Sequence, residues 1–124
     1  MVTLTAQTPA WLHGGHFVTR APANPPDRTF GLAIVVTTFR REAAVTGCIA
    51  RLTEMLDGGS LNGQRAHLFV VDNGQNLSPA SHPALTVIPN RNLGGAGGFA
   101  RGMQAAMQAG FSHCLFMDDD AACG

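Results

Sequence analysis

Three consecutive aspartates, Asp118, Asp119 and Asp120, directly follow an apolar run at residues 114–117. A run of this length is typical of a buried strand, so the three acids would emerge together where the strand leaves the sheet. Like charges this close repel one another unless they share a cation. Oxygen ligands favour Mg²⁺ or Mn²⁺ over zinc, and these ions keep open positions that substrate phosphates fill. The triplet therefore predicts a divalent-metal site for a phosphorylated substrate, with a solvated acidic turn or a helix N-terminus as the alternative.

Four short apolar runs predict the strands that would position these acids, at residues 32–36, 68–71, 85–88 and 114–117. The first run is apolar and β-branched almost throughout, which is typical of a central strand buried on both faces. Helical patterns separate the first run from the second and the third from the fourth, and this alternation predicts right-handed crossovers in an open, mostly parallel sheet with flanking helices. Ligands of such α/β folds bind beyond the carboxyl ends of the strands.

Two segments repeat apolar residues at helical spacing. The first, at residues 45–56, predicts an amphipathic crossover helix that ends before two glycines. The second carries Phe99, Met103 and Met107 and is closed by Gly110. We expect this Met and Phe stripe to face the core.

Polar residues follow each predicted strand. Arg41 offers paired donors for a phosphate or a base carbonyl, although a first-turn helix residue exposed to solvent is the alternative. Asp72 could accept hydrogen bonds from a base or a ribose, and Asn73 could pair with a base edge, whereas an Asx turn is the alternative for both. Asn90 and Asn92 follow the third run. Polar residues at all four strand ends predict a nucleotide-diphosphate site.

Four of the five residues from Gly94 to Gly98 are glycines, and such a segment carries a large entropic cost. We expect a ligand to approach its backbone closely. A glycine loop ahead of the second helix would offer bare amides and a helix N-terminus that favours anionic groups. The alternative is a flexible loop.

Composition excludes several classes of partner. The 124 residues, 45% of them hydrophobic, suffice for one domain with a core. Eight basic and eight acidic side chains give a formal net charge of zero, and no basic stretch alternates with aromatics, so no nucleic-acid partner is expected. No apolar run approaches the roughly 18 residues of a transmembrane segment, and no export signal is evident.

Cysteine usage points to a reducing compartment. Cys48, Cys114 and Cys123 are odd in number, widely spaced and without zinc-ligand spacing. We expect a cytoplasmic protein, either free or peripheral at the inner face of the cell membrane. Residues 1–30 are rich in proline and lack periodicity, so they are predicted to form an N-terminal arm or linker ahead of a domain at residues 31–124.

The segments VVTTFRR, VVDNG, NRNLGGAGGFARGM and LFMDDDA, in this order, resemble the nucleotide-sugar-binding half of GT-A glycosyltransferases of family two. Within that family the resemblance is to the galactofuranosyl and rhamnosyl transferase branch, and it covers about residues 32–121. It implies a Rossmann-like partial GT-A domain and an inverting transfer from a UDP- or dTDP-linked sugar to a glycan or lipid-linked acceptor. It also implies a Mn²⁺ or Mg²⁺ ion that bridges the diphosphate.

The resemblance assigns a role to each matching residue. Those expected to bind the nucleotide sugar are Thr37, Phe39 and Arg41 along the nucleotide, Asp72 and Asn73 at the base, Asn92 at the ribose or diphosphate, Gly94 and Gly95 in the glycine segment, and Asp119 closest to the sugar. Asp118 and Asp120 are expected to hold the metal. A strict Asp-x-Asp spacing on an extended segment turns the outer carboxylates one way and the middle one another.

The sequence departs from the family at its end. It stops at Gly124, whereas the family continues with acceptor-binding strands, a catalytic carboxylate base and often a metal-binding His. We therefore assign no catalytic residue, regard the chain as a truncated portion, and expect it to bind the donor weakly and not to turn over.

Two other classes of function remain open. The spacing Gly95-x-Gly97-x-x-Ala100, with Asp118 about 20 residues further on, also matches an NAD(P)-binding Rossmann fingerprint. A non-catalytic fragment that self-associates into a homo-oligomer is the second alternative, because an unfinished parallel sheet exposes an edge and apolar surface.

Overall fold

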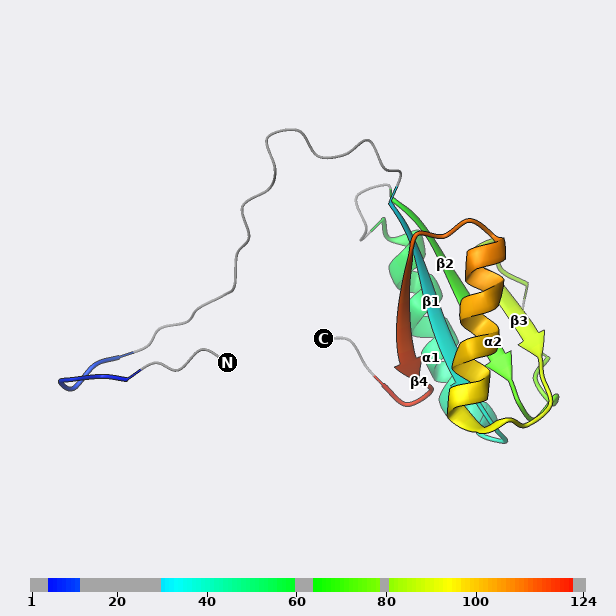
Figure 1. Ribbon diagram of the computed structural model, residues 1–124, viewed down its shortest axis with the longest axis horizontal. Helices are drawn as coiled ribbons and strands as arrows, with labels where there is room; N and C mark the ends of the chain where they lie inside the picture. Colours follow the sequence, from blue (N-terminus) through cyan, green and yellow to red (C-terminus); the bar gives the residue numbers. More distant parts are fainter. Residues whose placement is uncertain (1–4, 12–29, 60–63, 79–80, 122–124) are drawn as a thin grey trace.

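The computed structural model describes residues 5–11, 30–59, 64–78 and 81–121 (Figure 1). Its helices and strands follow the order β1 (Gly31–Thr38), α1 (Glu42–Asp57), β2 (Arg65–Asp72), β3 (Leu85–Pro89), α2 (Gly94–Gln108) and β4 (His113–Asp118). Of the predicted arm at residues 1–30, only 5–11 and Phe30 are described, and they are exposed and outside any helix or strand. The rest of that arm, and Cys123, lie outside the described residues.

The four strands of the described chain form one parallel sheet in the order β3-β2-β1-β4. The first strand is interior, as its continuous apolar sequence predicts. Its register pairs Thr38 with Asp72 of β2 and Thr37 with Asp118 of β4. The carboxyl ends of the parallel strands therefore lie together at the same end of the sheet. The prediction of an open α/β sheet with flanking helices is confirmed.

Helix α1 covers one face of the sheet with large side chains (Figure 1). Val45, Cys48 and Leu52 recur every three or four residues and are buried against the sheet. They pack against side chains of β1, β2 and β4, namely Ile34, Val36, Leu68, Val70 and Met117. The predicted helix at residues 45–56 is confirmed, with its buried face where the periodicity indicates.

Helix α2 covers the opposite face through small residues (Figure 1). Its buried positions are Gly98, Gly102 and Ala106. A Cβ atom added at Gly102 would overlap the side chain of Val35, so only glycine allows the helix axis to come this close to the sheet. The predicted core stripe is therefore wrong for its methionines: Met103 and Met107 are exposed, because the glycine face of α2 contacts the sheet instead, whereas Phe99 is partly buried against the core.

The glycine segment is part of α2 and does not form a loop ahead of it. The helix begins at Gly94, whose φ of 71° lies in the left-handed region that favours glycine. Gly98 lies in the second turn, and a Cβ there would come within 3.1 Å of the Asn73 amide. Tertiary contact thus stabilises a helical start that intrinsic propensity disfavours. Neither helix in the described part combines the length and apolar character needed to cross a membrane.

Candidate functional site

A cleft of about 290 Å³ opens at the carboxyl edge of the sheet. Its lining consists of Thr37, Thr38, Phe39, Arg41, Asn73, Asn92, Gly94, Gly95, Asp118 and Asp119. The structure thus brings together every predicted site residue except Asp72 and Asp120, and it adds Thr38. These residues come from the ends of β1, β2 and β4 and from the start of α2, which the parallel register brings to the same edge.

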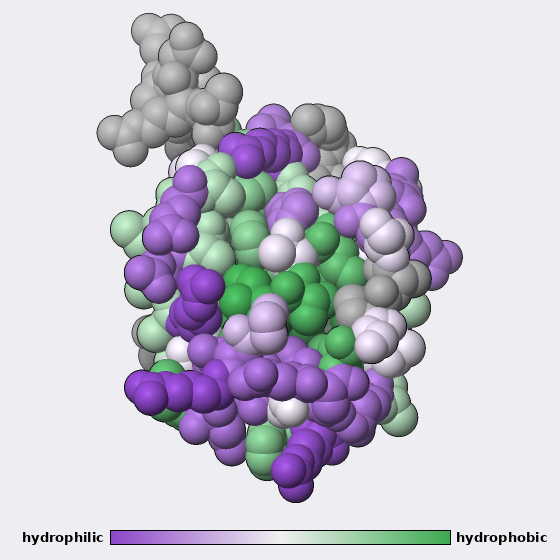
Figure 2. Space-filling view, turned by 90° about the vertical axis from the view of Figure 1, so that its right-hand side faces the viewer, coloured by the Kyte–Doolittle hydropathy of each residue, from purple (hydrophilic) through white to green (hydrophobic). Residues whose placement is uncertain are grey.

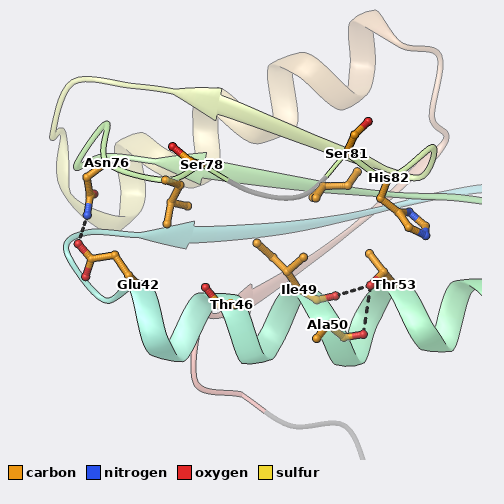
Figure 3. A pocket seen from close by; sticks show the side chains of 11 residues that line it. Glu42, Thr46, Ile49, Ala50, Thr53, Asn76, Ser78, Ser81 and His82 are labelled. Atoms are coloured by element: carbon orange, nitrogen blue, oxygen red, sulfur yellow. Dashed lines mark hydrogen bonds between the residues drawn. The ribbon is translucent and has the colours of Figure 1, made fainter.

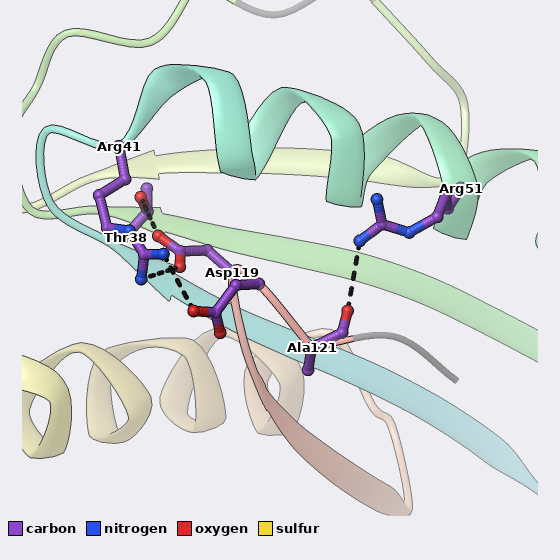
Figure 4. A network of polar contacts seen from close by, with 6 residues as sticks. Thr38, Arg41, Arg51, Asp119 and Ala121 are labelled. Carbon is purple, nitrogen blue, oxygen red and sulfur yellow. Dashed lines mark hydrogen bonds and ion pairs between the residues drawn. The ribbon is translucent and has the colours of Figure 1, made fainter. Parts of the chain in front are cut away.

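The middle aspartate of the triplet connects three elements (Figure 4). The hydroxyl of Thr38, at the end of β1, donates to Asp119 Oδ2 at 2.7 Å, and Arg41 Nη1 lies 2.7 Å from Asp119 Oδ1. The Asp119 side chain is only 4% exposed, so both of its oxygens have protein partners in a site with little water. A charged carboxylate in such a site requires this pairing. Thr38 carried no separate prediction, because a hydroxyl at a strand end looks like any other turn residue.

Arg41 also reaches the last aspartate. Its Nη2 donates to Asp120 Oδ2 at 2.9 Å, and both side chains are more than half exposed. This hydrogen bond is the main reason that the pKa of Asp120 lies below its ordinary value and that the pKa of Arg41 lies above its own. The guanidinium of Arg41 thus offsets the repulsion among the three aspartates. From the sequence alone, we expected a metal ion to have this role.

The outer aspartates provide the oxygen atoms available to a metal ion. Asp118 and Asp120 are exposed, whereas Asp119 is buried, so the outer and middle carboxylates differ in environment. Within the described residues, no group of three His, Cys, Asp or Glu side chains is placed to hold an ion. An ion at Asp118 and Asp120 would fill its remaining positions with water and substrate oxygens, as Mg²⁺ commonly does. The donor set therefore fits a hard cation bound jointly with a phosphorylated ligand.

Asp72 orders the loop that follows β2. Its carboxylate is buried and accepts backbone N–H bonds from Gly74, Asn76 and Leu77 at 2.8–2.9 Å. The sequence left an Asx turn open as the alternative for this residue, and the observed bonds are of that kind. Asp72 does not line the cleft, and its contact with a base stays a prediction.

Asn73 and Asn92 connect the loops around the start of α2. Asn73 is buried, with its Nδ2 donating to the Gly94 carbonyl at 3.3 Å and its Oδ1 accepting from Asn90 Nδ2 at 2.8 Å. Asn92 Oδ1 accepts the Gly94 N–H at 3.0 Å. A Cβ added at Gly95 would meet no atom within 4 Å, so the first turn of α2 opens onto the cleft. Helix N-termini of this kind favour anionic groups.

A second hollow, of about 440 Å³, lies between α1 and the segment that leads from β2 to β3 (Figure 3). Figure 2 shows a hydrophobic area framed by hydrophilic residues on the side of the molecule that carries β3. Ile49, Leu77 and Leu85 contribute apolar surface to this hollow, and Glu42 and His82 are among its polar residues. No predicted site residue lies in it. It is larger than the strand-end cleft, but it lacks the convergence of charged and amide groups that marks the cleft as the candidate site.

Comparisons with known proteins support a relationship to glycosyltransferases, the broader part of the resemblance seen in the sequence. No family model matches the chain. It is 35% identical to galactofuranosyltransferase GlfT1 of Mycolicibacterium smegmatis over 94 residues, covering 71% of this chain and 29% of the relative. It is 29% identical to galactofuranosyltransferase GlfT2 of Mycobacterium tuberculosis over 129 residues, covering 94% of this chain and 19% of the relative. The chain is similar to glycosyltransferases. It spans less than a third of the length of these curated relatives.

Proposed function

We propose that this chain is the donor-binding portion of a metal-dependent inverting glycosyltransferase of the GT-A family-two type. The observation that carries the proposal is the strand-end cleft, in which Arg41, Asn92, Asp118, Asp119 and the open first turn of α2 meet. The similarity to galactofuranosyltransferases supports the same reading. The donor is a UDP- or dTDP-linked sugar, galactofuranose ahead of rhamnose, and the acceptor is a glycan or a lipid-linked glycan.

Different residues of the cleft bind different parts of the donor. The amide of Gly95 and the side-chain Nδ2 of Asn92 bind the diphosphate, because a helix N-terminus attracts negative charge, while the Gly94 N–H keeps its bond to Asn92 Oδ1. Thr37 and Phe39 line the nucleoside, and the half-exposed Phe39 ring offers a face for the base. Asp119 keeps its partners Thr38 and Arg41, and in this way it holds the turn on which its two neighbours sit.

Asp118 and Asp120 hold a Mn²⁺ or Mg²⁺ ion in this proposal. They fit such an ion because both are exposed, one at the end of β4 and the other two residues further on, and supply oxygen ligands only. When bound, the ion stabilises the negative charge that develops on the departing nucleoside diphosphate. Arg41 keeps the turn formed without the ion by pairing with Asp120.

Calorimetric titration with UDP, in the presence and absence of Mn²⁺, tests the proposal. We expect Mn²⁺ to strengthen UDP binding by about tenfold or more. Asp118→Asn should remove most of this metal effect. Asp57→Asn is the matched control, because it removes the same charge from an exposed residue at the far end of α1 and should keep the effect. UDP binding that Mn²⁺ leaves unchanged in a folded sample, checked by circular dichroism, would refute the metal-dependent site.

The same titration with NADH examines the dinucleotide alternative. In a dinucleotide-binding Rossmann unit the glycine turn follows the first strand and opens directly into a helix. Here the glycines follow β3, at the margin of the sheet, and four residues separate Pro89 from Gly94. Tighter binding of NADH than of UDP would replace the transferase proposal with a dehydrogenase-type one.

A further inference from the structure

The guanidinium of Arg41 contacts two carboxylates that differ in burial (Figure 4). Its Nη1 lies 2.7 Å from Asp119 Oδ1, and its Nη2 donates to Asp120 Oδ2 at 2.9 Å. The Asp119 side chain is 4% exposed, whereas that of Asp120 is 61% exposed. Because a separate nitrogen of the planar guanidinium serves each acceptor, one contact can break while the other stays.

The contact with Asp119 is the more costly one to break. Asp119 is a buried charge whose other partner is the Thr38 hydroxyl, 2.7 Å away, and a buried carboxylate that loses its cation is strongly destabilised. The contact with Asp120 lies in water, where an ion pair contributes little to stability. A competing ligand would therefore separate Arg41 from Asp120 and leave it on Asp119.

The backbone of Arg41 is held in place, whereas its side chain reaches solvent. Arg41 is the N-cap residue of α1, and its carbonyl accepts the Val45 N–H at 3.0 Å. Its side chain is 51% exposed, and it lines the strand-end cleft together with Asn92 and Gly95, where the diphosphate is proposed to bind. A pivot of the guanidinium about Nη1 would let Nη2 change partner without any movement of the backbone.

The charges of the triplet match one divalent ion in addition to Arg41. Arg41 and Asp119 together are neutral, which leaves the negative charges of Asp118 and Asp120. Both of these residues are exposed, and a hard divalent cation takes oxygen ligands of this kind. The ion and the second guanidinium nitrogen of Arg41 therefore compete for Asp120.

We propose that Arg41 couples metal binding to donor binding by exchanging Asp120 for a phosphate oxygen. In the donor site of the proposed function, on which this step rests, Arg41 has a different partner in each state. Without the ion, Nη2 is bonded to Asp120, as observed. With a divalent ion at Asp118 and Asp120, Nη2 donates to the diphosphate of the donor, and Nη1 stays on Asp119. Each ligand then removes a competitor of the other, so the coupling is reciprocal.

Calorimetric titration of Mn²⁺, with and without UDP, measures this coupling. Arg41→Gln should bind Mn²⁺ alone about two- to fivefold more tightly than the unmodified chain, the range expected when an exposed ion pair no longer competes for Asp120. Mn²⁺ should then strengthen UDP binding by less than about threefold, against about tenfold or more in the unmodified chain. Arg51→Gln is the matched control, because it removes the same charge near the same turn, where Arg51 Nη2 donates to the Ala121 carbonyl at 3.3 Å. This control should keep the full effect of Mn²⁺ on UDP binding.

A second variant covers the case in which Arg41→Gln does not fold, as checked by circular dichroism. Arg41→Lys retains a positive charge for the buried Asp119, but a single ammonium replaces the two-nitrogen fork. It should therefore remain folded and still lose most of the dependence of UDP binding on Mn²⁺. An Arg41→Lys chain in which Mn²⁺ strengthens UDP binding as much as in the unmodified chain overturns the proposal.

The donor site and the coupling fail in different ways. UDP binding that Mn²⁺ leaves unchanged in the unmodified chain would remove both together. A metal effect that is present in the unmodified chain and equal in Arg41→Lys and Arg51→Gln would leave the donor site in place and overturn only the coupling by Arg41. UDP binding that the Arg41 variants weaken by the same factor with and without Mn²⁺ has the same meaning, because a phosphate contact independent of the ion needs no exchange of partners.

Discussion

The two helices cover the two faces of the same sheet by opposite means. Helix α1 inserts large side chains such as Leu52, whereas α2 brings a row of glycines against the strands and turns its methionines outward. Side-chain insertion keeps a helix at the usual distance from a sheet, and a glycine face lets the backbones approach. The close approach of α2 has a consequence for the cleft, since it brings Gly98, in the second turn of the helix, next to Asn73 and Thr37.

The two faces of the sheet differ in the side-chain volume that lies between helix and strands. On the α1 face, stability depends on atoms that fill space between helix and sheet. On the α2 face, it depends on the absence of atoms at Gly98 and Gly102. Smaller side chains should therefore harm the first face, and larger ones the second.

The largest expected effect is on the α1 face. Leu52 is 6% exposed and belongs to the cluster of α1, β1 and β2 side chains. Leu52→Ala should lower the free energy of unfolding by about 2–5 kcal/mol, because it removes buried methyl groups and leaves a cavity. Urea denaturation measures the change. A loss below about 1 kcal/mol would mean that α1 is not anchored through this residue.

A smaller loss is expected when volume is added to the α2 face. Gly102→Ala should destabilise the chain by about 1–3 kcal/mol, because the new methyl group overlaps Val35, which is fully buried. Gly95→Ala is the matched control on the same helix, since its methyl group would meet no atom. That change should stabilise by up to about 1 kcal/mol through the better helix propensity of alanine. Equal effects of the two substitutions in urea denaturation would contradict the close approach of α2.

The same contrast explains how much of the fold was predictable. Continuous apolar runs predicted the four strands and their parallel arrangement, and periodicity predicted the buried face of α1. A prediction from periodicity assumes that the apolar stripe of a helix faces the core, and α2 departs from this assumption. Phe99, Met103 and Met107 have the right spacing, but glycines on the neighbouring stripe give the tighter contact with the sheet. The spacing of apolar residues indicates which side chains could be buried. It carries no information about the energy gained when two backbones pack closely.

The candidate site shows a similar division. Strand-end positions sufficed to predict which residues meet in the cleft, because parallel strands end at one edge. The pairing of Arg41 with Asp119 and Asp120 was not predictable, since it depends on how the turns after β1 and β4 fold toward each other across many intervening residues. The second hollow was not predictable from the sequence either, because its lining residues come partly from α1 and partly from the segment that leads from β2 to β3.

The smallest expected effect is a pH dependence on the α2 side of the sheet. His67 lies beside the rings of Phe69 and Phe111, and burial, with the nearby charge of Arg65, lowers the pKa of its imidazole below the ordinary value. The unfolded chain therefore binds a proton more readily at this position than the folded chain does. Stability should be full above about pH 6.5 and should fall as the pH drops from there through the lowered folded-state pKa.

His67→Gln should flatten this part of the profile, measured as the urea midpoint at about pH 7.5 and about pH 5.5, on either side of the ordinary imidazole pKa. Glutamine retains a partner for Thr86, so the hydrogen bond between β2 and β3 need not be lost. His113→Gln is the control, because His113 is exposed and pairs in register with Leu32, on the α1 side of the sheet. If His113→Gln flattens the profile and His67→Gln does not, the pH dependence belongs to the α1 side, and the two faces differ in charge as well as in volume.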